Sequence, residues 1–246
     1  MFQSEKKHLA QHAKVWAQKR SLRLIYSDYY QRILKRLIPG LTLEVGAGIG
    51  QFKKAFPQCI SLDLFPFHSP DIIADAHRLP FKTSALHNIV AIDVFHHLER
   101  PTYFLKEVAR LLPAGGRLIL LEPGISPISS LFFRLFHSEP FDLAVDPLTP
   151  GPLTPDRSPL FAANQAFATT LIRQKKNLLQ NPPYRLCLIK KDWISLLAYP
   201  LTGGFKRWCL IPPAVIKPLL IIENFIARFV GHIFGFRLLI VFEKIG

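Results

Sequence analysis

Short apolar runs alternate with longer segments of mixed polarity along much of this 246-residue chain. Each run has about the length of a β-strand, and apolar residues at helical spacing, as at Phe104, Val108 and Leu111, separate some of the runs. This alternation predicts an α/β fold with a largely parallel sheet and helices on both of its faces. The expected strands cover residues 41–45, 59–62, a short run ending at 75, then 85–94, 117–123, 194–199 and 236–243.

The segments outside this pattern predict one domain, residues 1–246, in three parts. Residues 1–38 read as a helical N-terminal cap, in which Tyr26, Tyr29 and Tyr30 are candidates to line a pocket. Residues 39–123 form the core, and residues 124–246 hold insertions together with the final strands. Within the insertions, 137–159 contains six prolines and reads as an extended loop, while 162–179 reads as a helix.

The region from Leu41 to Asp63 holds the clearest ligand-binding signal. Three glycines, Gly46, Gly48 and Gly50, follow an apolar run at alternate positions, and Asp63 closes the next apolar run. Glycine lets a loop adopt positive φ and lets a ligand lie against the backbone, while a carboxylate at a strand end accepts hydrogen bonds from ribose hydroxyls. Glu44, just before the loop, suits a positively charged amine and would repel a pyrophosphate.

Three interpretations of this loop compete: a dinucleotide site, an S-adenosylmethionine site and a glycine-rich turn without a ligand. The dinucleotide fingerprint needs G-x-G-x-x-G, whereas the spacing here is G-x-G-x-G.

Four motifs in order resemble the class I S-adenosylmethionine-dependent methyltransferases, in the branch called type 11. They are E-x-G-x-G-x-G at 44–50 followed by Asp63, A-D-A-x-x-L-P-F at 74–81, D-V-F-H-H-L at 93–98 and L-L-x-x-G-G-x-L at 111–118. The resemblance implies a Rossmann-like seven-stranded sheet whose last strand is antiparallel, an N-terminal helical cap, C-terminal insertions that form the acceptor pocket, and S-adenosylmethionine as the cofactor.

The resemblance also assigns roles to individual residues. Asp63 would bind the ribose, Leu64 would stack beside adenine, and Asp75 with the Ala76 backbone would meet the adenine edge. The full set expected to bind the cofactor is Glu44, Gly46, Ala47, Gly48, Gly50, Asp63, Leu64, Asp75, Ala76 and Asp93.

Methyl transfer needs a protein base only when the acceptor carries a proton, and His96 and His97 are the nearest candidates. His137, Glu139 and Asp142 are further candidates from the proline-rich loop. No H-E-x-x-H or C-x-x-C spacing is present, so we predict no metal site.

The chain is basic, with a net charge of +14, and the excess is uneven. Residues 39–123 hold eight basic and eight acidic side chains, whereas 1–38 hold nine against two and 124–246 hold fourteen against seven. Basic flanks favour a phosphate-bearing partner, either an anionic membrane surface or a nucleic acid.

The three cysteines have no metal spacing, and the N-terminal segment has no apolar signal-peptide core. We expect a cytoplasmic protein, with peripheral binding at the inner face of a membrane as an alternative.

The strongly apolar segment 210–235 leaves three readings open: a buried core helix, a membrane-contacting helix or a dimer interface. It has no uninterrupted apolar span of about 20 residues, so a transmembrane helix is not expected. Lys206, Arg207 and Trp208 precede it, and 127–136 is a second apolar segment of the same kind.

The resulting functional hypothesis is a methyltransferase that acts on oxygen, carbon or nitrogen of a small-molecule or lipid-like acceptor. An RNA methyltransferase is one alternative, favoured by the basic flanks and weakened because the amino-group methylation signature is missing after the fourth strand. A non-catalytic cofactor-binding fold is the other. No pattern in the sequence predicts the oligomeric state.

Overall fold

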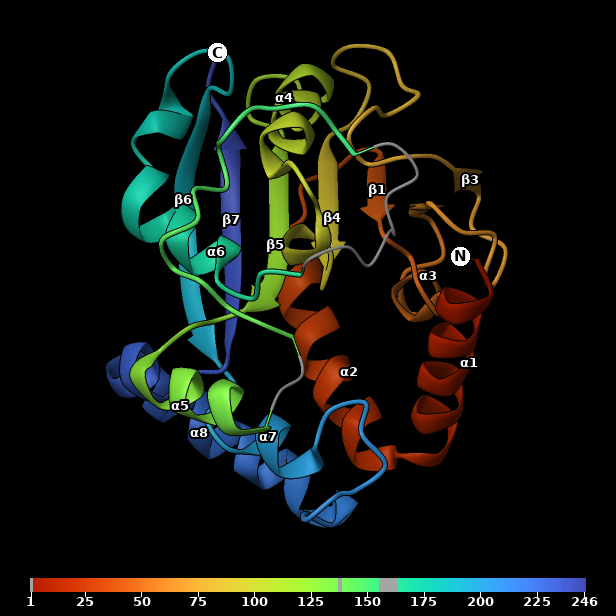
Figure 1. The fold of residues 1–246 in the computed structure, drawn as a ribbon, viewed down its shortest axis with the longest axis vertical. Coiled ribbons are helices and arrows are strands. Elements are labelled where there is room, and N and C mark those ends of the chain that lie inside the picture. The colour runs from red at the N-terminus through yellow and green to blue at the C-terminus, as the bar shows by residue number, and fades with distance from the viewer. Residues whose placement is uncertain (1, 137–138, 155–162) are drawn as a thin grey trace.

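The computed structural model describes residues 2–136, 139–154 and 163–246. Within them, seven strands form one sheet in the order β3-β2-β1-β4-β5-β7-β6 (Figure 1). β7 pairs antiparallel with both β5 and β6, while the other pairings are parallel. The strands are β1 Thr42–Val45, β2 Ile60–Asp63, β3 Ile72–Ile73, β4 Asn88–Ile92, β5 Arg117–Pro123, β6 Leu186–Ile194 and β7 Arg237–Lys244.

Eight α-helices and three short helical turns of other types occur in the described residues. The α-helices are α1 Phe2–Gln18, α2 Arg20–Leu34, α3 Gln51–Ala55, α4 Pro101–Leu111, α5 Pro127–Phe136, α6 Phe167–Thr170, α7 Ala198–Thr202 and α8 Pro213–Phe234. The turns are the 3₁₀ segments η1 Phe95–His97 and η3 Leu178–Gln180, and the π-helical turn η2 Leu171–Lys175.

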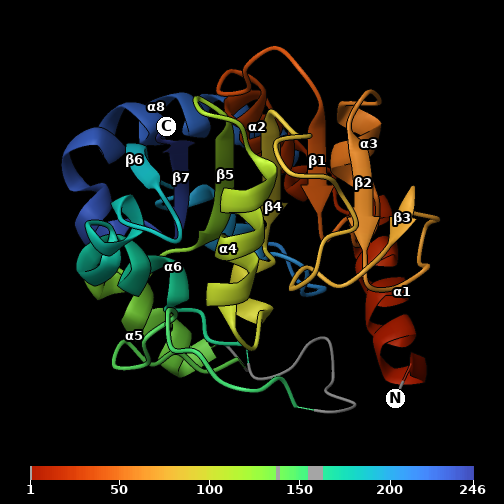
Figure 2. The ribbon, with the colours of Figure 1, turned by 90° about the horizontal axis from the view of Figure 1, so that it is seen from above.

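Helices cover both faces of the sheet, as expected for strands that are apolar along their whole length (Figure 2). Successive residues of a strand point to opposite faces, so β5 sends Leu118 and Leu120 into one core and Ile119 and Leu121 into the other. The first core contains buried side chains of α4 and α6, and the second contains buried side chains of α2 and α8. The predicted fold class is therefore confirmed, including the antiparallel last strand.

The carboxyl ends of the parallel strands point toward α1, α5 and α7 (Figure 1). This edge is where ligands bind in open α/β sheets, because the strands end there and the loops diverge. A third, smaller apolar cluster closes the edge under α5 and contains Ile125, Phe133, Ala166 and Phe236. The N-terminal cap predicted for residues 1–38 is thus an α1–α2 pair, of which α1 stands over this edge.

Two of the predicted strands are misplaced. The third ends at Ile73 rather than at Asp75. The sixth covers Leu186–Ile194, not 194–199. β6 is an edge strand with exposed lysines at 190 and 191, so its sequence is too polar to be recognised as a strand. The apolar run that was expected to be the strand instead forms a turn at Ser195 and then α7.

The helix predicted for 162–179 begins later and is broken. Residue 162 lies outside the described residues, and α6 begins only at Phe167 because Asn164 is engaged in the preceding loop. The Asn164 side chain accepts from the backbone N–H groups of Asp142 and Ala166. Within the predicted loop 137–159, the described part has bends and a turn and contains neither helix nor strand, while 137–138 and 155–159 lie outside the described residues.

The apolar segment 210–235 is mostly the helix α8, and the buried-core interpretation holds for only one of its sides. Ile216, Leu220 and Ala227 are buried, whereas Ile221, Phe225 and Phe229 are 73%, 62% and 66% exposed. In the described part of the chain, no helix has both the length and the apolar character needed to cross a membrane.

Candidate cofactor and acceptor site

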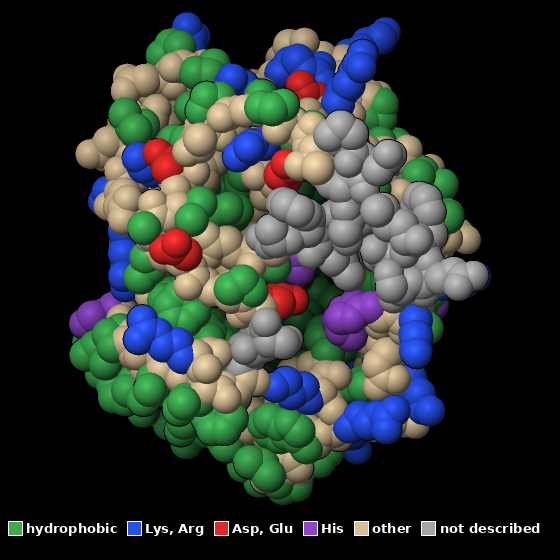
Figure 3. Space-filling model, in the orientation of Figure 1, with side chains coloured by type: hydrophobic (Ala, Val, Ile, Leu, Met, Phe, Trp, Pro, Cys, Tyr) green, Lys and Arg blue, Asp and Glu red, His purple; other side chains and the backbone are tan. Residues whose placement is uncertain are grey.

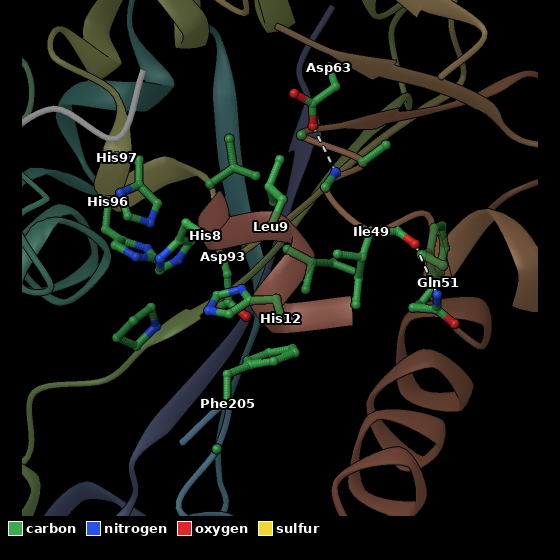
Figure 4. A pocket seen from close by; sticks show the side chains of 18 of the residues that line it. His8, Leu9, His12, Ile49, Gln51, Asp63, Asp93, His96, His97 and Phe205 are labelled. Carbon is green, nitrogen blue, oxygen red and sulfur yellow. Dashed lines mark hydrogen bonds between the residues drawn. The ribbon is translucent and has the colours of Figure 1, made fainter. Parts of the chain in front are cut away.

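A cavity of about 590 Å³ lies at the carboxyl edge of the sheet, within the size range of small-molecule sites. The ends of β1, β2 and β4 form its floor, and α1, α5 and the loop after α7 form its walls. Figure 4 shows Asp63, Asp93 and Phe205 around this cavity, together with His8, Leu9 and His12 of α1. The expected cap helix therefore borders the pocket.

The glycine loop begins directly after β1 and turns back over the end of β2. The N–H groups of Gly46 and Ala47 both donate to the Leu62 carbonyl, at 2.8 and 3.0 Å. Gly46 has φ of +75°, and a Cβ there would lie 2.2 Å from a methyl carbon of Val94. Only glycine can adopt this positive φ and also leave room for Val94. The tight turn that exposes the loop backbone to the cavity therefore requires glycine at position 46.

Glu44 places a carboxyl group at the base of the cavity. Its side chain is buried, and its Oε2 has no hydrogen-bond partner among the residues that the structure describes. Burial, and secondarily the nearby Asp63, raise the pKa of Glu44 to about 8. A buried oxygen without a partner is costly unless a ligand satisfies it. This acid therefore fits the positively charged amine that the sequence interpretation assigned to it.

Asp63 ends β2 and holds the loop in shape while lining the cavity. One carboxylate oxygen accepts from the Gly48 N–H at 2.7 Å, and the other accepts from the Phe65 N–H at 2.9 Å. Burial raises the pKa of Asp63, and the backbone donors oppose that shift. Its position at the strand end fits the ribose role predicted for it.

The residues predicted to meet adenine lie together on the next part of the lining. Leu64, Asp75 and Ala76 all border the cavity. Asp75 accepts from the backbone N–H of His77 at 2.9 Å and lies 2.6 Å from His77 Nδ1. These contacts hold the Asp75 carboxylate in place. Leu64 is partly exposed and offers an apolar surface on which an adenine ring could stack.

Asp93 follows β4 with φ of +57°, so its side chain turns across the sheet edge. It lies 2.6 Å from the buried guanidinium of Arg237 and accepts from the Tyr26 hydroxyl at 3.0 Å. Burial raises the pKa of Tyr26 well above its usual range, and the Asp93 charge adds to this shift, so the phenol stays a donor. Asp93 borders the cavity, but its carboxylate also joins β4 to β7.

The predicted base His96 is buried and paired with an acid that the sequence interpretation missed. Its Nδ1 lies 2.5 Å from Glu122, the penultimate residue of β5, which is fully buried. Glu122 also accepts from the backbone N–H groups of Val94 and Phe95, at 2.9 and 2.8 Å. Burial lowers the pKa of His96, but the charge and hydrogen bond of Glu122 outweigh burial and leave this pKa raised. Glu122 therefore fixes the ring with its Nε2 on the pocket side.

His97 lies beside His96, with ring centroids 4.1 Å apart. Burial and the charge of His96 lower the pKa of His97 to about 2, so this ring is neutral. Glu139 approaches the same point and lies 3.9 Å from His96 Nε2. Ligand atoms of His96, His97 and Glu139 lie within 4.8 Å of one another, a grouping that could hold a metal ion. The absence of a metal thus stays a prediction.

Lys19, between α1 and α2, orders the wall opposite the histidines. Its buried ammonium lies within hydrogen-bond distance of four backbone carbonyls, those of Thr202, Gly204 and Trp208 at 2.9, 2.8 and 3.0 Å and that of Lys206, which share its three N–H donors. Burial lowers the pKa of Lys19. A single lysine in a helical segment carries no signal of such a role, so only the folded structure identifies it.

Eleven of the twelve predicted site residues border the same cavity. The exception is Gly50, which precedes α3 with φ of +69° and lies behind the loop. Of the three tyrosines, Tyr26 and Tyr30 line the cavity, while Tyr29 hydrogen-bonds Ser195 behind it. His137 lies outside the described residues. Phe132, Phe205 and Phe236 line the cavity without having been predicted to do so.

Comparison with known families supports the interpretation drawn from the motifs. Residues 43–120 match the family model described as a methyltransferase domain. An uncharacterised protein of Methanocaldococcus jannaschii is 28% identical over 124 residues. That match spans 47% of this chain and 59% of the relative.

Solved structures share the fold at low sequence identity. A SAM-dependent methyltransferase from Archaeoglobus fulgidus superposes with a TM-score of 0.52 at 14% identity, over 90% of this chain and 94% of that one. Geranyl diphosphate C-methyltransferase from Streptomyces coelicolor gives a TM-score of 0.51 at 13% identity, over 89% and 76% of the two chains. Residues 43–120 are therefore similar to a methyltransferase domain, and the described chain has the fold that these solved S-adenosylmethionine-dependent methyltransferases share.

Proposed function

We propose that this protein transfers a methyl group from S-adenosylmethionine to a small, largely apolar, lipid-like acceptor. The observation that carries the proposal is the different lining of the two ends of the cavity. Glu44, Asp63 and loop backbone line the end near β1 and β2, and Phe132, Phe133, Phe205 and Phe236, together with His96 and Glu139, line the end near α5 and α7. A polar cofactor fits the first half and an apolar acceptor fits the second.

In this proposal the cofactor is held by residues from three strand ends. Glu44 would bind the amine, the Gly46–Gly48 backbone would lie along the amino-acid portion, and Asp63 would accept from the ribose hydroxyls. Leu64, Asp75 and Ala76 would enclose the adenine. When bound, S-adenosylmethionine supplies an electrophilic methyl group on a sulfonium, whose sulfur leaves as a neutral thioether.

The chain itself contributes alignment, exclusion of water and a base. The four phenylalanines near α5 and α7 exclude water from the space between the cofactor's methyl group and the acceptor atom. If the acceptor atom carries a proton, His96 Nε2 takes it as the new bond to the methyl carbon forms and the carbon–sulfur bond breaks. Glu122 orients the ring and stabilises the resulting imidazolium, since it lies on Nδ1. A tertiary amine acceptor, which has no proton to lose, would not need this step.

The apolar acceptor is supported by the cavity lining and by one structural relative. Geranyl diphosphate C-methyltransferase, whose fold this chain shares, was solved with an isoprenoid diphosphate analogue. The RNA alternative rests on overall basic charge, and the aromatic wall of the cavity gives it no added support.

The first experiment is calorimetric titration with S-adenosylhomocysteine, with NADH as the control ligand. We expect micromolar binding of the first and none of the second. Incubation with methyl-tritiated S-adenosylmethionine then compares incorporation into a total bacterial lipid extract and into total RNA. Label in the organic phase supports the proposal, whereas label confined to RNA contradicts it. The absence of S-adenosylhomocysteine binding would favour the non-catalytic alternative.

A further inference from the structure

Exposed apolar side chains gather on one surface of the molecule, which we call the α5–α8 face and define as residues 127–136 and 197–234. Figure 3 shows hydrophobic side chains concentrated at the lower left, where α5 and α8 lie in Figure 1. This face holds fifteen of the twenty-two exposed large hydrophobic side chains found in the described residues. They are Ile128, Leu131, Leu135, Phe136, Leu197, Trp208, Leu210, Val215, Ile221, Ile222, Phe225, Ile226, Phe229, Ile233 and Phe234.

The spacing along α8 shows why this surface is not simply the outside of a core helix. Ile221, Phe225 and Phe229 recur every four residues on the exposed side. The inner side is anchored instead by the buried Glu223, which accepts from the N–H groups of Leu197 and Ala198 at 2.9 Å each. α8 therefore has a fixed orientation, and its apolar stripe stays turned to the outside. A patch of this extent marks an interaction site.

Charge on the α5–α8 face favours one occupant. Its exposed charged side chains are all cations: Arg134, Lys206, Arg207, Lys217 and Arg228. The only acid in these segments is Glu223, which is buried. A second copy of the chain would bring these like charges together, which opposes pairing through this face. Anionic lipid headgroups would instead neutralise the cations while the acyl region receives the apolar stripe.

The cavity reaches this same face. Phe132, Lys206 and Trp208 belong to the α5–α8 face and also line the cavity. Trp208 is 41% exposed, so its ring spans from the pocket to the surface, an arrangement suited to the headgroup level of a membrane. Lys19 fixes the loop that carries Trp208 through its bonds to the carbonyls of 202–208.

We propose that the α5–α8 face binds the surface of an anionic lipid bilayer without crossing it. α8 and α5 would lie in the plane of the interface, with their cations at the headgroups. The consequence that an apolar acceptor passes directly from the bilayer past Trp208 rests on the proposed function, whereas the binding of the bilayer does not.

The test is co-sedimentation of the full chain with vesicles of phosphatidylglycerol and phosphatidylcholine, compared with vesicles of phosphatidylcholine alone. We expect binding to the anionic vesicles that weakens as salt rises. The variant Phe225→Glu/Phe229→Glu should lose about tenfold or more of its vesicle partition coefficient, because two inserted rings become charged. Lys217→Gln/Arg228→Gln should weaken binding to anionic vesicles specifically.

A matched control replaces exposed apolar residues outside the face. Leu41→Glu/Leu178→Glu changes two side chains of 54% and 52% exposure and should leave the partition coefficient unchanged. Wild-type protein that stays in the supernatant at low salt would overturn the proposal, and so would equal losses in the control and the α8 variant. A wild-type dimer that Phe225→Glu/Phe229→Glu converts to a monomer in sedimentation velocity, without vesicle binding, would assign the face to self-association instead.

Calorimetric titration of every variant with S-adenosylhomocysteine separates this proposal from the proposed function. Retained cofactor affinity shows that a variant which no longer binds vesicles is still folded. If the protein binds vesicles but not S-adenosylhomocysteine, the proposed membrane surface stands and the proposed methyltransferase function is wrong. If it binds S-adenosylhomocysteine but not vesicles, the proposed function stands and the proposed membrane surface is wrong.

Discussion

The Nδ1 of His96 lies 2.5 Å from a carboxylate oxygen of Glu122, which connects the loop after β4 to the end of β5. Both side chains are buried, and Glu122 also holds the backbone at the start of η1. The pair resembles the oriented imidazole of acyl-transfer enzymes in one respect: a carboxylate selects the tautomer and favours the charged ring. This geometry is the reason that we propose His96, rather than its neighbour His97, as the base of the reaction.

Replacing either partner should reduce turnover for an acceptor with a labile proton. His96→Gln should lower kcat by about a hundredfold or more, the usual contribution of a positioned base, with little change in S-adenosylhomocysteine affinity. In wild-type protein kcat should rise with pH as His96 loses its proton, with a midpoint above the ordinary histidine pKa. Glu122→Gln should lower kcat as well, since a Gln side-chain amide can donate to Nδ1 and thereby place the proton on Nε2.

His97→Gln serves as the comparison for the pH profile. The pKa of His97 is lowered to about 2, so its replacement should not move the midpoint. Unchanged kcat in His96→Gln would show that the acceptor needs no protein base.

Glu44 should couple cofactor binding to pH. Its pKa of about 8 means that the folded chain keeps a proton that the unfolded chain loses above about 4.5, so the cofactor-free protein loses stability as pH rises through this window. Glu44→Gln should remove that loss, making the variant more stable than wild type at pH 8 and similar near pH 4. It should also weaken S-adenosylhomocysteine binding by about tenfold or more, because a charge-assisted hydrogen bond is lost.

Thermal unfolding at both pH values, together with calorimetry, checks these effects. Glu243→Gln, a partly exposed acid of β7 far from the cavity, should change neither the pH dependence nor the affinity. Equal affinity of Glu44→Gln and wild type would remove Glu44 from the cofactor site.

Local signals in the sequence were sufficient to predict which residues line the cavity near β1 and β2. The glycine loop, Asp63 and Asp75 are each defined by neighbours a few residues away, so a short sequence pattern identifies them. The last strand, β7, was also predicted almost to its ends because both of its faces are buried and its sequence is continuously apolar. β6 was missed because it lies at the sheet edge, where lysines face solvent.

The part of the cavity near α5 and α7 depends on contacts that no sequence spacing encodes. Glu122 meets His96 across 26 residues and two strands, and Lys19 meets the 202–208 carbonyls across more than 180 residues. In the sequence, Glu122 is one acid at the end of an apolar run, and Lys19 is one of many lysines. The apolar content of 210–235 could not reveal which side would be buried, since that is decided by Glu223 and by packing on β6 and α2.

The pairing of Asp93 with Arg237 predicts a large effect on stability. Asp93→Asn keeps a residue type that tolerates the φ of +57° but leaves a buried guanidinium without its counter-charge. We expect a loss of about 3 kcal/mol in the free energy of unfolding, measured by denaturant titration. Adding Arg237→Met should restore part of this loss, because no unpaired charge remains.

The surface pair of Asp192 with Arg36 gives the control for this experiment. Asp192→Asn should cost less than about 1 kcal/mol, since both side chains are partly exposed. A similar cost for Asp93→Asn would show that Arg237 is satisfied by other groups, such as the Tyr29 and Tyr199 rings beside it.

The grouping of His96, His97 and Glu139 predicts how divalent metal ions should affect the proposed methyl transfer. We expect purified protein to contain no stoichiometric metal and EDTA to leave methyl transfer unchanged, because the sulfonium leaving group needs no Lewis acid. Added Zn²⁺ should nevertheless inhibit, since His96 Nε2 faces His97 and Glu139 with ligand atoms within 4.8 Å, and a bound ion would occupy the lone pair that the base needs. Glu139→Gln should weaken this inhibition by removing one ligand while leaving the Glu122–His96 pair in place.

Elemental analysis of the purified protein and activity assays with and without EDTA check the metal content and the metal independence. Loss of activity in EDTA that a divalent ion restores would show that the site holds a resident metal and that the prediction of none is wrong.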